Sequence, residues 1–160
     1  MARFLIVGCG CRGQALAREL IAAGHPVRGT TRDPARVPDI EAAGAEAVVA
    51  DPFRLATLMP YVDGASAVLW LMGSADGPVH AERIESMLEF IVDTPARGLV
   101  YETGGVEREA GVFAVRCAVE TYGMPVEILE TDPADHERWL SDARDAALRL
   151  LGITLNPGAS

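Results

Sequence analysis

The stretch of sequence that decides the fold is FLIVGCGCRG, residues 4–13. Its first four residues are apolar and are predicted to form a short buried strand. Glycines then follow at positions 8, 10 and 13, in the spacing G-x-G-x-x-G. Residues 14–23 are expected to form a helix that ends at Gly24. The sequence thus opens with a predicted strand, a tight glycine turn and a helix.

Each glycine of this loop has a separate expected role. Gly8 permits the tight turn, Gly10 allows the backbone to approach a pyrophosphate group, and Gly13 lets the helix pack closely on the strand. The free amides at the start of the helix, around Cys11 and Arg12, would then bind the negative charge. The alternative is a glycine-rich turn that binds nothing. The strand before it and the helix after it are, however, the context that the binding motif requires.

Short apolar runs alternate with helical patterns along the whole sequence, which predicts an α/β fold. The expected strands are 4–7, 27–31, 47–50, 67–72, 99–102 and 126–129, and the expected helices are 14–23, 35–43, 55–61, 80–92, 106–122 and 134–151. We therefore expect a doubly wound parallel six-stranded Rossmann-type sheet in a single domain, residues 1–152, followed by a C-terminal tail, 153–160. Ligands of such sheets bind beyond the carboxyl ends of the strands, where the strand order reverses.

An aspartate–proline pair recurs before three of the predicted helices: Asp33-Pro34, Asp51-Pro52 and Asp132-Pro133. An aspartate side chain accepts hydrogen bonds from the free amides of a first helical turn, and proline needs no donor there. The pairs therefore predict the points at which strands give way to helices.

Composition excludes several classes of protein. The 49% of hydrophobic residues rules out a disordered chain. The 14 basic residues are all arginine, and 23 acidic residues give a net charge of −9, which argues against nucleic acid or an anionic membrane as partner. No apolar run approaches a membrane helix or a signal peptide, and three cysteines make no even disulfide framework or metal site. We therefore expect a cytoplasmic protein without a bound metal.

The end of the second predicted strand indicates the type of cofactor. In a fold that binds a dinucleotide, an acidic residue here favours the ribose hydroxyls of NAD, whereas a basic residue suits the 2′-phosphate of NADP. Arg32 occupies this place, Thr31 adds a hydroxyl, and Arg12 of the glycine loop is expected nearby as a second cation. Asp33 is interpreted as a helix cap. The sequence therefore favours NADP over NAD as the cofactor.

The order Gly8-Cys9-Gly10 also resembles the nucleotide motif of methyltransferases. In that family an acidic residue usually precedes the first glycine, and another ends the second strand. Here neither place is acidic, because the strands end in Leu5-Ile6-Val7 and Thr30-Thr31-Arg32. The dinucleotide interpretation is therefore preferred.

Taken together, the glycine loop, the segment Thr31-Arg32-Asp33-Pro34, Asp51-Pro52 and Gly73 resemble the atypical short-chain dehydrogenase/reductases, in particular the NmrA-like and epimerase-like NAD(P)-binding proteins. The resemblance implies that Asp51, beside Pro52, meets the adenine amino group. It also implies that Leu71, Met72 and Gly73 line the nicotinamide half of the cofactor.

The chain departs from this family in its catalytic residues. The family pairs a tyrosine with a lysine four residues later, and this sequence contains no lysine. The usual serine after the fifth strand is replaced by Glu102-Thr103, so Thr103 and Glu102 are the candidate catalytic groups. The larger members also carry a substrate lobe after the sixth strand, where this chain has one more helix. Two hypotheses follow: a small atypical NADP-dependent oxidoreductase acting on a carbonyl or quinone, or a non-catalytic redox sensor that acts through a protein partner.

Three side-chain interpretations remain open in the sequence. Glu102 either faces the nicotinamide or pairs with Arg97, Arg108 or Arg116. Cys9 and Cys11 either sense redox state or are small residues that fit the loop, and Cys117 is expected to pack. The apolar stripes of the helices at 80–92 and 106–122 either form a homodimer or face the sheet.

Overall fold

The computed structural model describes residues 3–72, 82–104 and 108–152. These residues form one α/β domain, as predicted, with a parallel six-stranded sheet in the order β3-β2-β1-β4-β5-β6. The strands are β1 (Phe4–Val7), β2 (Val27–Thr31), β3 (Glu46–Val49), β4 (Ala67–Trp70), β5 (Leu99–Glu102) and β6 (Val126–Leu129). The helices are α1 (Cys11–Ala22), α2 (Val37–Ala42), α3 (Met59–Val62), α4 (Glu82–Ile91), α5 (Arg108–Tyr122) and α6 (His136–Leu150), with 3-10 turns η1 (Pro34–Arg36) and η2 (Leu55–Thr57). Gly73 and the predicted tail at 153–160 lie outside the described residues.

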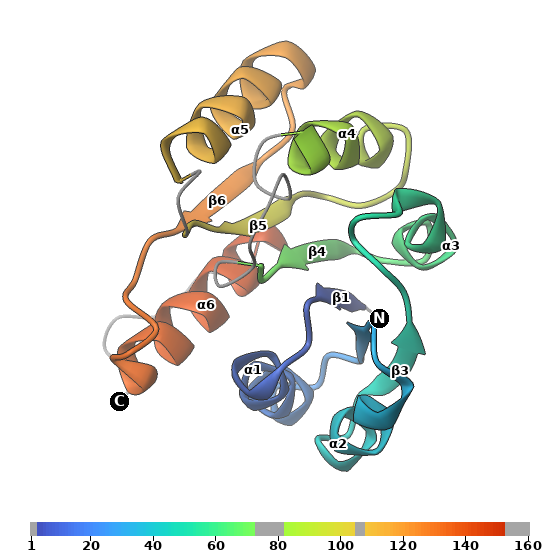
Figure 1. Cartoon of the computed structure of the whole chain (residues 1–160). Coiled ribbons are helices and arrows are strands. Elements are labelled where there is room, and N and C mark those ends of the chain that lie inside the picture. Colours follow the sequence, from blue (N-terminus) through green and yellow to red (C-terminus); the bar gives the residue numbers. More distant parts are fainter. Residues whose placement is uncertain (1–2, 73–81, 105–107, 153–160) are drawn as a thin grey trace.

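The helices cover both faces of the sheet (Figure 1). Helices α1, α2 and α6 pack on one face, around Phe4 and Ile6 of β1, and α3, α4 and α5 pack on the other, around Leu5 and Val7. Burial on both sides explains why the central strands are apolar at every position. Strand order reverses between β1 and β4, so the ends of these two strands mark the place where a ligand of this fold binds.

The predicted aspartate cap is confirmed for Asp33, the N-cap of η1, but not for Asp51 and Asp132, because η2 starts after Arg54 and the N-cap of α6 is Asp135. In each pair the Asp Oδ1 accepts a hydrogen bond from the amide two residues later: 3.0 Å for Asp33 and Ala35, 2.9 Å for Asp51 and Phe53, and 2.9 Å for Asp132 and Ala134. These aspartate turns stop the chain from continuing as a strand and turn it back across the carboxyl edge of the sheet.

Helix boundaries differ from the prediction where glycine or proline intervenes. Helix α1 begins at Cys11, three residues before the predicted start, because Gly10 is its N-cap. The helix predicted over 35–43 divides into η1 and α2, with Pro38 at the start of α2, and the one predicted over 55–61 divides into η2 and α3, with Pro60 at the start of α3. Proline lacks the amide that a continuous helix requires, so each helix restarts there.

The apolar stripe of α4 faces the sheet. Ile84, Met87, Leu88 and Ile91 are buried in the core between α4 and the strands. On α5, by contrast, Phe113 is 71% exposed. The apolar stripe of α4 therefore faces the sheet, which is one of the two alternatives left open by the sequence. None of the described helices is long and apolar enough to span a membrane.

Candidate functional site

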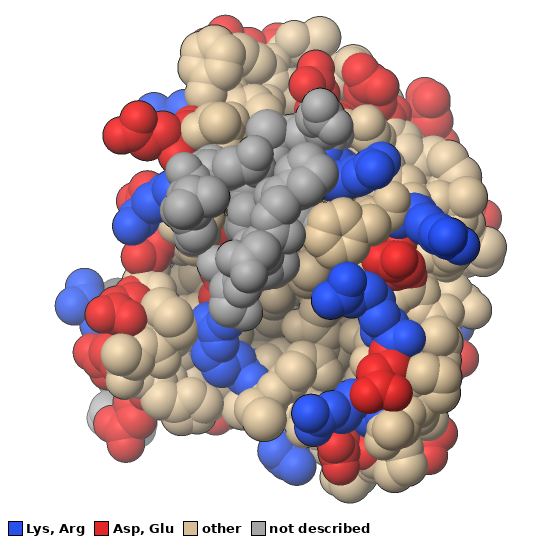
Figure 2. All heavy atoms as spheres, viewed as in Figure 1, with Lys and Arg blue, Asp and Glu red and all other residues tan. Residues whose placement is uncertain are grey.

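A cavity of about 740 Å³ lies at the carboxyl ends of β1, β2 and β4, where the strand order reverses. It is lined by Gly8, Cys9, Gly10, Cys11, Gln14, Thr30, Thr31, Arg32, Arg36, Asp39, Ala50, Pro52, Leu71 and Met72. In Figure 2, arginine side chains lie around the hollowed part of this face. The cavity thus brings the glycine loop together with the end of β2 and the end of β4, as the sequence predicts.

The glycine loop is held in a conformation that only glycine adopts readily. Gly8 has a φ of +84°, and its amide donates a hydrogen bond to Thr30 Oγ1 over 3.2 Å. A Cβ added at Gly8 would lie 2.6 Å from Met72 Sδ and 2.7 Å from the Leu71 carbonyl oxygen. The loop therefore lies directly against the end of β4.

Gly10 differs from Gly8 because its missing side chain leaves space open. A Cβ at Gly10 would meet no atom within 4 Å, although Gly10 borders the cavity. The helix that it caps has no side-chain cap, so the amides of its first turn have no side-chain acceptor there. This opening beside free amides fits an anionic group such as a pyrophosphate.

Gly13 packs α1 onto β1. A Cβ there would lie 3.3 Å from Ile6 Cγ2 and 3.4 Å from Cys9 Sγ, which is tight contact. Cys9 is buried, and burial raises the pKa of its thiol to about 12. Cys9 therefore acts as a packing residue, while Cys11 is exposed and lines the cavity. The expectation that Cys117 packs is wrong, because it lies on the exposed side of α5.

The end of β2 presents a cation to the cavity. The guanidinium of Arg32 lies over the Phe53 ring, with Cζ 5.3 Å from the centroid. Throughout residues 3–72, 82–104 and 108–152, no carboxylate lies within ion-pair distance of Arg32. Thr31 Oγ1 accepts a hydrogen bond from the Asp33 amide over 3.1 Å, and the Asp33 carboxylate caps Ala35. The acidic residue is thus committed to the backbone, and the arginine faces the cavity.

The segment after β3 forms another part of the wall. Pro52 is buried and lines the cavity, whereas Asp51 caps the amide of Phe53 and is not among the lining residues. Leu71 and Met72, both buried, close the cavity on the β4 side.

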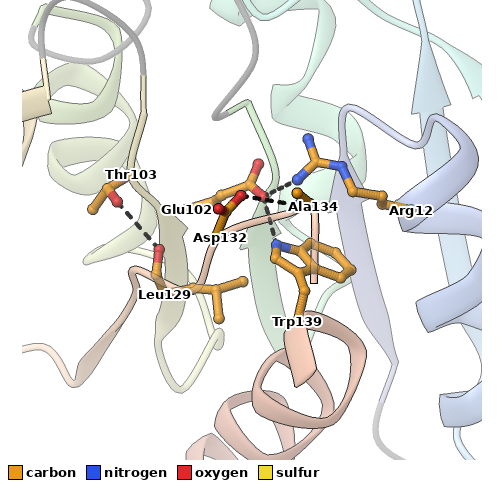
Figure 3. A network of polar contacts seen from close by, with 7 residues as sticks. All are labelled: Arg12, Glu102, Thr103, Leu129, Asp132, Ala134 and Trp139. Atoms are coloured by element: carbon orange, nitrogen blue, oxygen red, sulfur yellow. Dashed lines mark hydrogen bonds and ion pairs between the residues drawn. The ribbon is translucent and has the colours of Figure 1, made fainter. Parts of the chain in front are cut away.

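Glu102, at the end of β5, is only 2% exposed and belongs to a buried polar network. Its Oε2 atom accepts a hydrogen bond from Arg12 Nη1 over 2.6 Å and another from Trp139 Nε1 over 2.8 Å (Figure 3). The expectation that Glu102 pairs with an arginine is thus confirmed, but the partner is Arg12 and not Arg97, Arg108 or Arg116. Arg97 instead donates to the Leu151 carbonyl.

Arg12 and Arg32 lie on different sides of the glycine loop. Arg32 directly follows β2, one neighbour of β1, whereas Arg12 reaches Glu102 of β5, the strand beyond β4, which is the other neighbour of β1. The expectation that Arg12 lies beside Arg32 as a second cation is therefore wrong. Thr103 lies next to Glu102, and its hydroxyl donates to the Leu129 carbonyl of β6 over 3.4 Å, a long hydrogen bond (Figure 3).

Among the residues of this region that sequence reasoning missed, Thr30 and Trp139 make specific side-chain hydrogen bonds. Thr30 is a buried polar residue in β2 that holds the Gly8 amide. Trp139 lies in the helix predicted over 134–151 and was given no role in the site. A buried indole N–H needs an acceptor, and a buried carboxylate needs donors, so the two requirements together are the signal that links Trp139 to Glu102.

Another cavity, of about 510 Å³, lies after β6 along α6. Five carboxylates line it, those of Glu130, Asp132, Asp135, Asp142 and Asp145, with Arg138 and Arg149 as the cations. This excess of negative charge disfavours a phosphate-bearing ligand, so the cavity at the glycine loop is the better candidate.

Comparison with known proteins gives a matching family model and related folds. A model of the NAD(P)H-binding family matches residues 8–114. No curated protein matches the chain. UDP-N-acetylglucosamine 4-epimerase from Bacillus cereus has the same fold with a TM-score of 0.72 at 13% identity, over 94% of this chain and 74% of that one.

Two further solved structures carry a dinucleotide. A short-chain dehydrogenase/reductase superfamily protein from Agrobacterium tumefaciens with bound NAD has a TM-score of 0.66 at 19% identity, over 96% of this chain and 63% of that one. The Citrobacter sp. triphenylmethane reductase complexed with NADP(H) has a TM-score of 0.63 at 17% identity, over 81% of this chain and 49% of that one. The chain spans between 49% and 74% of the solved structures that it resembles.

Proposed function

The chain belongs to the NAD(P)H-binding family, with the fold of the atypical short-chain dehydrogenase/reductases, and we propose that it binds NADP(H) in preference to NAD(H). The position of Arg32 is the observation that supports the preference for NADP(H). Arg32 lies at the end of β2, lines the cavity and is held over the Phe53 ring. An arginine in this place binds a 2′-phosphate through charge-assisted hydrogen bonds, whereas NAD usually relies on an acidic residue there. Asp33, the nearest acidic side chain in sequence, already caps Ala35.

The binding residues expected from the sequence divide among the parts of the dinucleotide. The loop Gly8, Gly10 and Gly13, with the amides of Cys11 and Arg12, would hold the pyrophosphate. Thr31 and Arg32 would hold the 2′-phosphate. Asp51 and Pro52 would border the adenine, and Leu71, Met72 and Gly73 would border the nicotinamide half. The open space at Gly10 and the uncapped first turn of α1 support this arrangement.

The test is a calorimetric titration of the purified protein with NADPH and, separately, with NADH. We expect a dissociation constant on the order of micromolar for NADPH and binding at least about tenfold weaker for NADH, since a charged hydrogen bond contributes about 1.5–3 kcal/mol. Equal affinities would overturn the NADP preference. Failure of both nucleotides to bind would overturn the site.

We further propose that the protein is a small oxidoreductase acting on a carbonyl or quinone, in which Thr103 holds the proton at its Oγ1 atom. The reduced nicotinamide, when bound, supplies a hydride. With no lysine in the chain to lower the pKa of a tyrosine, the substrate must need little help from a proton donor. Among the described residues, the Thr103 hydroxyl makes only a long hydrogen bond, to the Leu129 carbonyl, which supports its being available for substrate. A cytoplasmic location and a homodimer belong to the same proposal.

The absence of lysine also favours a second candidate, a non-catalytic sensor of NADP(H) that acts through a protein partner. The two candidates differ in a simple measurement. An oxidoreductase consumes NADPH when quinones or reactive carbonyls are added, whereas a sensor binds NADPH without consuming it.

A further inference from the structure

The Arg12, Glu102 and Trp139 side chains form a network that joins three elements distant in sequence. Arg12 lies in the first turn of α1, Glu102 at the end of β5 and Trp139 in the first turn of α6. Both donors converge on one atom, Glu102 Oε2, and the Arg12 guanidinium also lies 5.1 Å from the centroid of the Trp139 ring. The arginine is thus held by an ion pair and by an aromatic face.

This network borders the glycine loop. A small cavity of about 170 Å³ is lined by Gly8, Gly10, Cys11, Arg12, Gly13, Leu71 and Trp139. It adjoins the loop from the α6 face of the sheet, away from the Arg32 site at the end of β2. Trp139 therefore brings the last helix into contact with the site, although it lies more than a hundred residues beyond the loop in sequence.

We propose that Glu102 and Trp139 are positioning residues, which fix Arg12 so that its guanidinium meets the nicotinamide-side phosphate of the dinucleotide. This inference rests on the proposed binding of NADP(H). An arginine carries five N–H donors in a planar fork, and the ion pair with Glu102 engages Nη1. Within the described part of the chain, Arg12 makes its hydrogen bonds to Glu102 alone. Held in this way, the guanidinium loses less conformational entropy when it binds a second anion.

The direction of the Arg12 side chain implies that the two phosphates of the pyrophosphate have different binding partners. Arg12 points toward β5, past β4, while the adenosine end of the ligand is expected at β2 beside Arg32. The adenosine 5′-phosphate would then lie on the loop amides, and the second phosphate nearer to Arg12. A ligand that ends at the adenosine 5′-phosphate should therefore bind independently of the Arg12 network.

The experiment compares NADP⁺ with adenosine 2′,5′-bisphosphate, which carries the 2′-phosphate and the 5′-phosphate but no second phosphate or nicotinamide. Both are titrated by calorimetry into the wild-type protein and the Glu102→Gln variant, which keeps the shape and an acceptor but removes the charge. We expect Glu102→Gln to weaken NADP⁺ about tenfold and to change the affinity for the bisphosphate less than about twofold.

Glu46→Gln is the matched control. Glu46 pairs with Arg28 over 3.0 Å, and the Arg28 guanidinium lies 5.4 Å from the centroid of the Tyr61 ring, so an arginine, a carboxylate and an aromatic ring also meet here, from β2, β3 and α3. Neither Arg28 nor Glu46 lines the cavity at the glycine loop. We expect Glu46→Gln to leave both affinities unchanged.

A second variant, Trp139→Phe, keeps the Glu102 carboxylate, Arg12 and an aromatic side chain, and removes the indole N–H together with part of the ring system. Trp139→Phe should weaken the affinity for NADP⁺ about threefold and leave the affinity for the bisphosphate unchanged. It also tests the proposal if Glu102→Gln does not fold. Equal weakening of both ligands in either variant, or of neither, would overturn the positioning role. If the wild-type protein binds neither ligand, the proposed function itself is overturned, which is a different result from selective failure in the variants.

Discussion

The Arg32 guanidinium lies over the Phe53 ring at 5.3 Å and joins two segments that are 21 positions apart in sequence. Arg32 follows β2, and Phe53 follows β3, where its amide is fixed by the Asp51 cap. Because β2 and β3 are parallel neighbours, their carboxyl ends meet, and the ring orients an arginine that would otherwise be a flexible surface side chain. The proposed site for the adenosine half of the ligand thus depends on two strand ends.

The first prediction concerns the charge of Arg32. Arg32→Asp should weaken NADPH by about tenfold to a hundredfold, because it replaces a partner of the 2′-phosphate with a like charge. Affinity for NADH should change by less than about threefold, since NADH has no 2′-phosphate. Calorimetric titration of both nucleotides checks the ratio. An equal loss for NADPH and NADH would show that the 2′-phosphate is not recognised at Arg32.

The second prediction separates the ring of Phe53 from its bulk. Phe53→Leu removes the aromatic face and keeps an apolar side chain, so Arg32 loses a cation–π contact of about 0.5–1 kcal/mol at an exposed site. We expect NADPH affinity to fall about threefold and the melting temperature to stay within a few degrees of wild type. Phe53→Tyr keeps the aromatic face and serves as the control. A weaker affinity in Phe53→Tyr equal to that in Phe53→Leu would contradict the role of the ring.

The sequence predicted the fold and the cavity well because both depend on local patterns. Alternating strands and helices, the G-x-G-x-x-G spacing and the aspartate turns are all contained within a few residues of the chain. The predicted arginine partner of Glu102 was wrong, because the true partner depends on which helices pack on the same face of the sheet. The periodicity of α1 and α6 shows that each has an apolar stripe, but not that both pack on the same side of β1 and β5.

The third prediction contrasts two glycines of one loop. In Gly10→Val the added Cβ meets no atom within 4 Å, so the melting temperature should stay close to wild type, but the side chain would occupy the proposed place of the pyrophosphate. In Gly8→Ala the φ of +84° and the 2.6 Å approach to Met72 Sδ should lower the free energy of unfolding by about 2 kcal/mol or more. Thermal denaturation and NADPH titration together check both. Unchanged NADPH affinity in Gly10→Val would contradict the proposal that the glycine loop binds the pyrophosphate.

The fourth prediction concerns Thr103. Thr103→Ala should leave NADPH affinity within about twofold, because in the described part of the chain the hydroxyl bonds only to the Leu129 carbonyl and Thr103 is not among the residues that line the cavity. Any NADPH consumption with a quinone or carbonyl should fall about tenfold to a hundredfold if Thr103 supplies the proton. Thr103→Ser, which keeps the hydroxyl, should retain most of the activity. Equal activity in the alanine variant would assign the proton to another group, such as water.

The last prediction uses the pKa of Cys9. Burial raises this pKa from 9.0 to about 12, so the folded protein keeps a neutral thiol at a pH where the unfolded chain has ionised. The unfolded state then binds fewer protons, and the free energy of unfolding falls as the pH rises above about 9. In Cys9→Ala this contribution is absent. The stability difference between wild type and Cys9→Ala should therefore shrink by about 2 kcal/mol between pH 7.5 and pH 10.5 in urea denaturation.

Cys117→Ala, which removes an exposed thiol, is the control and should show no such dependence. A wild-type curve parallel to that of Cys9→Ala over this range would mean that Cys9 ionises in the folded protein, and its assignment as a packing residue would fail.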